Sequence, residues 1–163
     1  MNKSVICPGS FDPVTLGHLD IISRASKMFD HVIVAVLRNS AKERSSFTVE
    51  ERIELLQEAT KDLGNIEVVS FDGLLAEYAK KRNVTTIVKG LRAVSDFEYE
   101  FQMALTNKML NPDLETVFLT TSAQNMYLSS SMVKQVASLG GDIKGFVPDC
   151  VLDKIVDRLS TEK

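Results

Sequence analysis

The sequence of 163 residues contains no tryptophan, two cysteines, four prolines and eight glycines. So little glycine and proline excludes collagen-like and Pro/Gly-rich chains, and a hydrophobic fraction of 44% argues against a disordered protein. No apolar run approaches the roughly 20 residues that a membrane-spanning helix requires. The apolar stretch near the N-terminus is too short for a secretory signal, so we expect a cytoplasmic protein that does not enter membranes.

Neither sign of charge dominates the chain. Nineteen Lys and Arg residues oppose 22 Asp and Glu residues, which gives a net charge of -3. Proteins that hold a nucleic-acid backbone usually carry a basic surplus, so we expect no nucleic-acid partner. A small anionic ligand is still compatible with this balance, because a few well-placed cations are enough to bind it.

The two cysteines, Cys7 and Cys150, form no CxxC pair and have no histidine at the spacing of a zinc site. The sequence therefore predicts neither a redox motif nor a thiolate metal site. Two reduced thiols buried in the core are the simpler expectation.

Short β-rich runs alternate with helical patterns along the whole chain. The runs are strongly hydrophobic, which is typical of parallel strands that helices cover on both faces. We predict an α/β fold: a single Rossmann-like, doubly wound domain over residues 1–163, with a five-stranded parallel sheet and helices on both faces. The predicted strands are residues 4–7, 32–37, 66–70, 86–89 and 116–119, and the predicted helices are residues 18–29, 49–63, 74–82, 96–110, 130–139 and 149–159.

Local sequence chemistry supports several helix ends. Thr48 followed by Glu51 fits a capping box at the start of the second helix. Glycines 140 and 141 are expected to end the fifth helix, because glycine accepts the left-handed conformation there. Pro148 suits the beginning of the last helix.

The predicted helix after Asp96 is apolar on two sides. The residues of one side are Phe97, Phe101, Ala104 and Leu105, and those of the other are Tyr99, Met103, Thr106 and Leu110. The domain's own sheet can cover one of these sides, so the other is expected to meet another subunit. The sequence therefore predicts a homo-oligomer.

Ligands of α/β sheets bind beyond the carboxyl ends of the strands, so the loop after the first strand is the place to search. This loop, residues 8–18, contains neither the GxGxxG spacing of a dinucleotide site nor the Gly-Lys-Ser/Thr of a P-loop. It does place Gly17 and His18 at a helix N-terminus, where backbone N–H groups and the helix dipole attract anions. For His18 taken alone, a capping or surface role is the more common one, so the other loops decide the interpretation.

Further polar loops follow the other strands. Lys42 lies after the second strand, and Lys89 and Arg92 follow the fourth. A serine-rich segment, residues 129–131, opens the helix after the fifth strand. Because these loops converge on one edge of the sheet, they predict a polyphosphate site that works by positioning and charge.

Three stretches carry a resemblance to a known family. Pro8-Gly9-Ser10-Phe11-Asp12-Pro13 followed by Thr15-Leu16-Gly17-His18 resembles the (Thr/His)-x-Gly-His signature of the nucleotidyltransferase superfamily. Residues 89–100, Lys-Gly-Leu-Arg-Ala-Val-Ser-Asp-Phe-Glu-Tyr-Glu, resemble the bacterial phosphopantetheine adenylyltransferases in particular. Residues 129–134 resemble the serine-rich second signature, and the similarity extends over essentially the whole chain.

The resemblance implies a reaction and an assembly. Members of this family transfer an adenylyl group from ATP to 4'-phosphopantetheine, which gives 3'-dephospho-CoA and pyrophosphate in coenzyme A biosynthesis. The acceptor phosphate attacks directly, so no covalent enzyme intermediate is expected. A homohexamer is also implied, whereas the two-sided helix by itself indicates only some oligomer.

The resemblance also implies three catalytic residues. His18 would contact the α-phosphate of ATP and stabilise its extra charge in the transition state. Lys42 would bind the attacking phosphate, and Arg92 would hold the phosphates that leave as pyrophosphate. Such fixed donors act mainly where charge develops during the reaction.

Further substrate contacts follow from the same motif positions. The implied ATP-binding residues are Ser10, Phe11, His18, Gly90, Leu91, Arg92, Glu100, Asn125, Met126, Tyr127, Leu128, Ser129, Ser130 and Ser131. The implied residues for the acceptor are Ser10, Lys42, Leu75 and Lys89. Leu75 fits an ordinary core leucine almost equally well.

Two features concern charge at the implied site. Lys89 stands where the family commonly has arginine, so a single point charge replaces a bidentate grip. Mg²⁺ is the expected cofactor, held mainly by the ATP phosphates and water, because the sequence shows no carboxylate cluster that would form a protein site for it.

Two alternatives stay open. A sibling nucleotidyltransferase could act on another phosphate acceptor, such as nicotinamide mononucleotide or glycerol phosphate, although residues 89–100 argue against it. A non-catalytic nucleotide-sensing module on the same fold would bind ATP and release no pyrophosphate.

Overall fold

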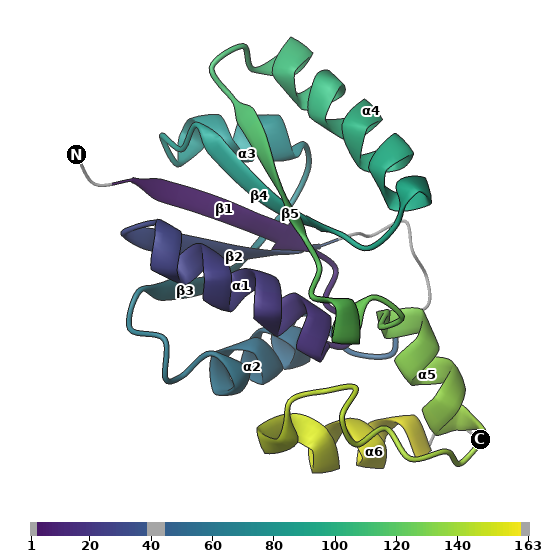
Figure 1. Cartoon of the computed structure of the whole chain (residues 1–163). Coiled ribbons are helices and arrows are strands. Elements are labelled where there is room, and N and C mark those ends of the chain that lie inside the picture. The colour runs from purple at the N-terminus through teal and green to yellow at the C-terminus, as the bar shows by residue number, and fades with distance from the viewer. Residues whose placement is uncertain (1–2, 39–44, 161–163) are drawn as a thin grey trace.

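Five strands lie parallel in one sheet, in the order β3-β2-β1-β4-β5 (Figure 1). The computed structural model describes residues 3–38 and 45–160. The strands are β1 Ser4–Gly9, β2 His31–Leu37, β3 Ile66–Phe71, β4 Thr86–Leu91 and β5 Glu115–Thr120. The chain builds outward from β1 to β3 and then returns to the other side of β1 with β4. The strand order therefore reverses between β1 and β4, which is where α/β sheets open a ligand crevice.

Helices cover both faces of the sheet, as predicted. They are α1 Leu16–Met28, α2 Val49–Ala59, α3 Leu75–Lys81, α4 Val94–Leu110, α5 Ser130–Ser138 and α6 Leu152–Ser160, with short 3-10 turns η1 Ala123–Asn125 and η2 Asp149–Val151. Side chains that alternate along β2 point to opposite faces: Val34 joins the larger core with α1, α2, α5 and α6, while Ile33 joins the smaller core with α3.

The helix ends follow the local chemistry of the sequence. Thr48 and Glu51 form the predicted capping box at the start of α2. This helix ends at Ala59 rather than at residue 63, because the chain turns after Thr60, whose hydroxyl donates back to the Leu56 carbonyl. Gly140, with a φ of 79°, follows the end of α5 as expected. Pro148 precedes η2 before α6 begins.

The expectation that both thiols are buried is wrong for one of them. Cys7 is buried in β1, but Cys150 is exposed. The reason is geometric: η2 turns Val151 into the core and leaves its neighbour Cys150 at the surface.

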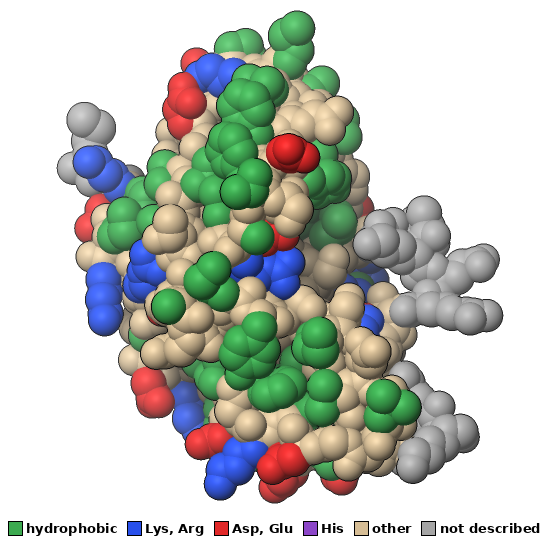
Figure 2. Space-filling model, turned by 45° about the vertical axis from the view of Figure 1, so that its right-hand side comes forward, with side chains coloured by type: hydrophobic (Ala, Val, Ile, Leu, Met, Phe, Trp, Pro, Cys, Tyr) green, Lys and Arg blue, Asp and Glu red, His purple; other side chains and the backbone are tan. Residues whose placement is uncertain are grey.

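The sheet covers α4 less than the sequence suggested. This helix packs against α3 and the β4–β5 edge, and Asn107 is its one buried residue. Phe97 on one side is 43% exposed and Tyr99 on the other is 63% exposed. Figure 2 shows hydrophobic side chains over the upper part of the molecule, where α4 lies. Both apolar sides of α4 are therefore largely uncovered in the single chain.

No helix among the described residues combines the length and the apolar character that crossing a membrane requires.

Candidate active site

A cavity of about 290 Å³ lies at the carboxyl ends of β1 and β4, where the strand order reverses. In Figure 2, lysine and arginine side chains gather near the centre of the face, between two areas of hydrophobic side chains. The predicted residues that line the cavity are Ser10, Phe11, His18, Lys89, Gly90, Arg92, Glu100, Leu128, Ser129 and Ser130.

Other predicted residues lie outside the cavity wall. Leu91 ends β4, and Asn125 is buried in η1, where its carbonyl accepts from the Leu128 backbone. Met126 and Tyr127 are exposed, and Ser131 is exposed in the first turn of α5. Within the Asn125–Ser131 segment, the structure therefore brings Leu128, Ser129 and Ser130 to the cavity.

Two predicted acceptor residues, Leu75 and Lys42, are not among the described residues that line the cavity. Leu75 starts α3 and packs against the smaller core, which is the alternative that the sequence left open for it. Lys42 lies outside the described residues, so the structure does not place it.

His18 lines the cavity and also caps its own helix. The backbone N–H of Thr15 donates to His18 Nδ1 at 3.0 Å, while His18 N donates to Thr15 Oγ1 at 3.2 Å. Burial, with Lys89 and Arg92 adding positive charge nearby, lowers the pKa of His18 to about 4. The ring is therefore neutral near pH 7. Because Nδ1 accepts a hydrogen bond, the proton lies on Nε2, which can donate to an anion.

The loop after β1 is held in an unusual conformation. Phe11 has a φ of 50°, in the left-handed region that few bulky residues adopt. Its ring lies so close to Gly9 that an added Cβ there would be 3.0 Å from the ring atoms. Buried Arg52 donates to the carbonyl of Ser10 at 2.8 Å and so fixes the loop from α2. The motif residues thus form a tightly supported wall of the cavity.

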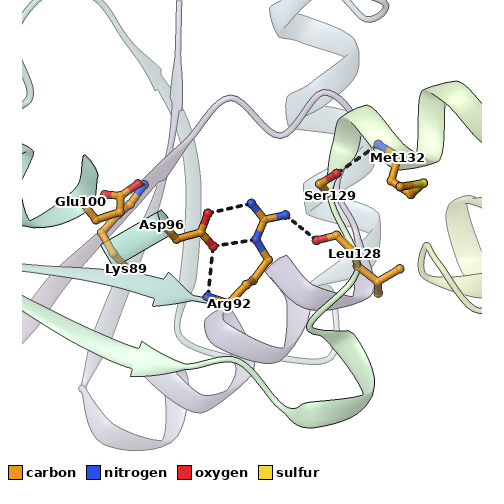
Figure 3. A network of polar contacts seen from close by, with 7 residues as sticks. All are labelled: Lys89, Arg92, Asp96, Glu100, Leu128, Ser129 and Met132. Carbon is orange, nitrogen blue, oxygen red and sulfur yellow. Dashed lines mark hydrogen bonds and ion pairs between the residues drawn. The ribbon is translucent and has the colours of Figure 1, made fainter. Parts of the chain in front are cut away.

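Lys89 in β4 and Arg92 just after it face two carboxylates from α4 (Figure 3). Arg92 makes a bidentate pair with Asp96, with Nε to Oδ2 at 2.9 Å and Nη2 to Oδ1 at 3.1 Å. Lys89 Nζ lies 3.4 Å from Glu100 Oε1. The Arg92 hydrogen bonds hold the pKa of Asp96 below its usual range, so this carboxylate stays charged at neutral pH.

The first residues of α5 add hydroxyl groups and backbone donors to the cavity. Ser129 caps the helix, because its Oγ accepts from the backbone N–H of Met132 at 3.0 Å (Figure 3). The Ser130 hydroxyl donates to the Pro13 carbonyl at 2.7 Å and ties α5 to the loop after β1. A helix N-terminus that opens into a cavity next to cations is suited to bind phosphate.

The cavity offers donors and charge, while two of its residues, His18 and Cys7, are respectively a poor base and a poor nucleophile. His18, with its lowered pKa, is a weak base. Burial raises the pKa of the Cys7 thiol to about 12, so the reactive thiolate is scarce. The described part of the cavity therefore suits transfer between phosphates, in which stabilisation of developing charge is the main task.

Sequence reasoning missed two residues that shape this site. The sequence showed Thr15 as a member of the first motif and gave it no role of its own. In the structure its backbone N–H donates to His18 Nδ1 and so fixes the tautomer of His18. Asp96 lies four residues after Arg92, a spacing that brings side chains together at the start of a helix and could have signalled the pair.

Comparisons with known proteins agree with this geometry. Residues 6–136 match the cytidylyltransferase-like family. The phosphopantetheine adenylyltransferase of Caldanaerobacter subterraneus subsp. tengcongensis is 61% identical over 156 residues, which cover 96% of this chain and 97% of the relative. The enzyme of the same name from Clostridium tetani is 58% identical over 158 residues, covering 97% and 98% of the two chains.

A solved structure shares the fold at much lower identity. It comes from Vibrio parahaemolyticus, is described as a "Putative Nicotinate-nucleotide Adenylyltransferase", and superposes with a TM-score of 0.69. The match covers 97% of this chain and 96% of that one at 20% identity, so it supports the fold alone. The sequence relatives go further: by identity over nearly its full length, the chain belongs to the phosphopantetheine adenylyltransferases, within the cytidylyltransferase-like nucleotidyltransferases.

Proposed function

We propose that the chain transfers the adenylyl group of ATP to 4'-phosphopantetheine, giving 3'-dephospho-CoA and pyrophosphate for coenzyme A biosynthesis. One observation carries this proposal: in a chain 61% identical to a phosphopantetheine adenylyltransferase, His18, Arg92 and Ser129 line one cavity at the switch point of the sheet. This is the place, and these are the donors, that binding of a triphosphate requires.

The proposed division of labour follows from the contacts. Neutral His18 would donate from Nε2 to the α-phosphate, where negative charge grows in the transition state. Arg92, Ser129 and the N-terminus of α5 would hold the β- and γ-phosphates, which leave as pyrophosphate. Ser10 and Phe11, which also line the cavity, would contact the substrates near the α-phosphate.

The acceptor is expected on the side of β4 that carries Lys89. Lys89 Nζ lies 3.4 Å from Glu100 Oε1. When the acceptor binds, the ammonium would leave this carboxylate and bind a phosphate oxygen of the acceptor. Lys42 is proposed to bind the attacking phosphate, and Leu75 to lie beside the pantetheine arm. An acceptor phosphate is already anionic at neutral pH, so it can attack without a protein base.

Magnesium is proposed to enter together with ATP. Among residues 3–38 and 45–160, no group of three or more His, Cys, Asp or Glu comes together to hold a metal. The two carboxylates of the cavity, Asp96 and Glu100, are already paired with Arg92 and Lys89. The phosphates and water would thus supply most of the ligands, and the ion would neutralise phosphate charge.

A homo-oligomer, with a hexamer as the size that the resemblance implies, is also proposed. Its support is the uncovered apolar surface of α4, on which Leu105 is 56% and Met109 is 84% exposed. The cytoplasm stays the predicted compartment.

The test of function is pyrophosphate release with Mg²⁺, ATP and 4'-phosphopantetheine. CTP replaces ATP, and nicotinamide mononucleotide replaces the acceptor, as matched controls. Release only with ATP and phosphopantetheine would support both the reaction and its specificity. Release with another acceptor would overturn the substrate assignment, and ATP binding without release in any combination would favour a sensing module.

A further inference from the structure

We propose that Asp96 is a positioning residue for Arg92. Its carboxylate holds the guanidinium in place at the cavity, so Arg92 is already ordered when it binds the leaving phosphates. This inference rests on the proposed function. Arg92 directly follows β4, Asp96 lies in the first turn of α4, and both line the cavity.

The hydrogen bonds of Arg92 leave part of its donor set for a ligand. A guanidinium has five N–H donors in a rigid plane. Nε and Nη2 each give one donor to Asp96, and Nη1 gives one to the Leu128 carbonyl at 2.8 Å. Two of the five donors are thus not engaged by these partners. Arg92 can stay bound to Asp96 and still present N–H groups to a phosphate.

The guanidinium is held from two different parts of the chain. Asp96 belongs to α4, whereas Leu128 directly precedes Ser129, the cap of α5 (Figure 3). This two-sided attachment fixes both the position and the plane of the group. It also places Arg92 beside the N-terminus of α5, so the arginine and the helix donors can bind the same phosphate chain.

The carboxylate is itself fixed, which argues against a simple exchange of Asp96 for phosphate. Asp96 Oδ2 accepts from the backbone N–H of Arg92 at 3.1 Å in addition to the side-chain bond. One carboxylate therefore binds the backbone and the side chain of the same arginine. A ligand would have to break three hydrogen bonds to displace it.

The neighbouring pair provides a contrast. Lys89 Nζ approaches Glu100 Oε1 to 3.4 Å, which is longer than the bonds of 2.9 and 3.1 Å between Arg92 and Asp96, and an ammonium has no preferred plane. This pair can separate when a phosphate arrives, whereas the Arg92–Asp96 pair is shaped to persist. The structure thus gives the two cations different tasks, one exchangeable and one fixed.

The experiment is a double-mutant cycle on residues 92 and 96, read as kcat and KM for ATP. Asp96→Asn keeps the shape of the side chain and removes its charge and one acceptor. We expect kcat/KM for ATP to fall roughly 10–100-fold, as for other residues that orient a ligand-binding group, with KM for 4'-phosphopantetheine nearly unchanged. In an Arg92→Ala background, the same change should have little further effect, because its target is absent.

Glu98→Gln is the matched control. Glu98 is an exposed carboxylate on the same helix, outside the cavity, and it makes no ion pair within residues 3–38 and 45–160. The control should keep the parent kinetics. The thermal unfolding midpoint of each variant shows whether a change in kinetics comes from weaker ATP binding or from an unfolded protein. If Asp96→Asn does not fold, Asp96→Glu replaces it, because the longer side chain keeps the charge but cannot keep the same three hydrogen bonds with Arg92.

Three results would overturn the inference. Tighter ATP binding in Asp96→Asn would make Asp96 a competitor of phosphate. An undiminished loss in the Arg92→Ala background would mean that Asp96 acts on substrate or fold directly. Unchanged kinetics would leave it without a role. Calorimetric titration with ATP measures the dissociation constants of the same four proteins without turnover. The coupling between Arg92 and Asp96 is therefore testable even if the proposed reaction fails.

Discussion

Lys134 on α5 ion-pairs with Asp12 in the loop after β1, with Nζ 3.1 Å from Oδ2, across 122 residues of chain. The same buried carboxylate accepts backbone N–H groups from Ser46 at 3.1 Å and Phe47 at 2.9 Å. Asp12 therefore joins three segments: the motif loop, the residues before α2, and the helix whose first turn reaches the cavity. A motif residue with no direct place in the cavity wall thus acts by holding the wall together.

Lys134→Met should destabilise the protein, because it removes the ammonium that pairs with the buried Asp12 carboxylate. We expect a loss of roughly 1–3 kcal/mol in the free energy of unfolding, measured by urea denaturation with an unchanged m-value. Lys144→Met, at an exposed position, is the control and should stay within about 0.5 kcal/mol of the parent. Equal midpoints for the two variants would contradict a structural role for the pair.

Gly90→Ala tests how closely the end of β4 approaches α1. A Cβ at residue 90 would lie 2.8 Å from Ile21 Cγ1, so Ile21 must shift, and both residues line the cavity. Overpacking of this kind costs roughly 1–3 kcal/mol, and the displaced side chain should also weaken ATP binding. Gly64→Ala is the matched control, because nothing lies within 4 Å of its added Cβ. If both variants have the unfolding free energy and the ATP affinity of the parent, residue 90 does not approach Ile21 closely.

The sheet and its helices could be predicted because their causes are local. The side chains of Thr48 and Glu51 each accept a hydrogen bond from the other residue's backbone N–H within one turn. Val34 and Ile33 are adjacent hydrophobic residues of β2 whose side chains point to opposite faces, so they indicate that both faces are buried. The edge at which a ligand is expected follows from the parallel strands alone. Such features need no knowledge of which segments meet.

The parts that escaped prediction depend on contacts between distant segments. The bond from Arg92 to the Leu128 carbonyl joins residues 36 positions apart, and no sequence period encodes it. The exposure of Cys150 depends on how η2 meets the core, and its sequence neighbours do not reveal that. Likewise, the sequence showed two apolar sides of α4 without showing that the sheet leaves both largely open, as at Phe97 and Tyr99.

The exposed surface of α4 predicts that assembly depends on this helix. Leu105→Glu combined with Met109→Glu places two charges where an apolar contact would otherwise exclude water. We expect the mass from light scattering at micromolar concentration to fall below that of the parent. Met28→Glu on α1, where Met28 is 55% exposed, is the control and should leave the mass unchanged. A parent protein that is already monomeric would remove the argument.

His18→Ala should affect turnover far more than ATP binding. The Nε2–H donor gains strength only when charge develops on the α-phosphate, so its loss should lower kcat by about 10²–10³-fold. The dissociation constant for ATP, measured by calorimetry, should change by only a few-fold because the other donors remain. Equal losses in binding and in turnover would contradict a role in the transition state.

The ionisation of His18 gives a prediction about pH. Burial, with the charges of Lys89 and Arg92, lowers the pKa of this ring from 6.5 to about 4. Between these two values the unfolded chain binds more protons than the folded one, so the contribution to stability is complete above pH 6.5 and is lost as the pH falls towards 4. The ring resonances of His18, assigned with a His31→Gln variant, should accordingly titrate near pH 4. Titration near pH 6.5 instead would mean that the imidazole is protonated as easily as in water, and that it meets the phosphates partly as a cation.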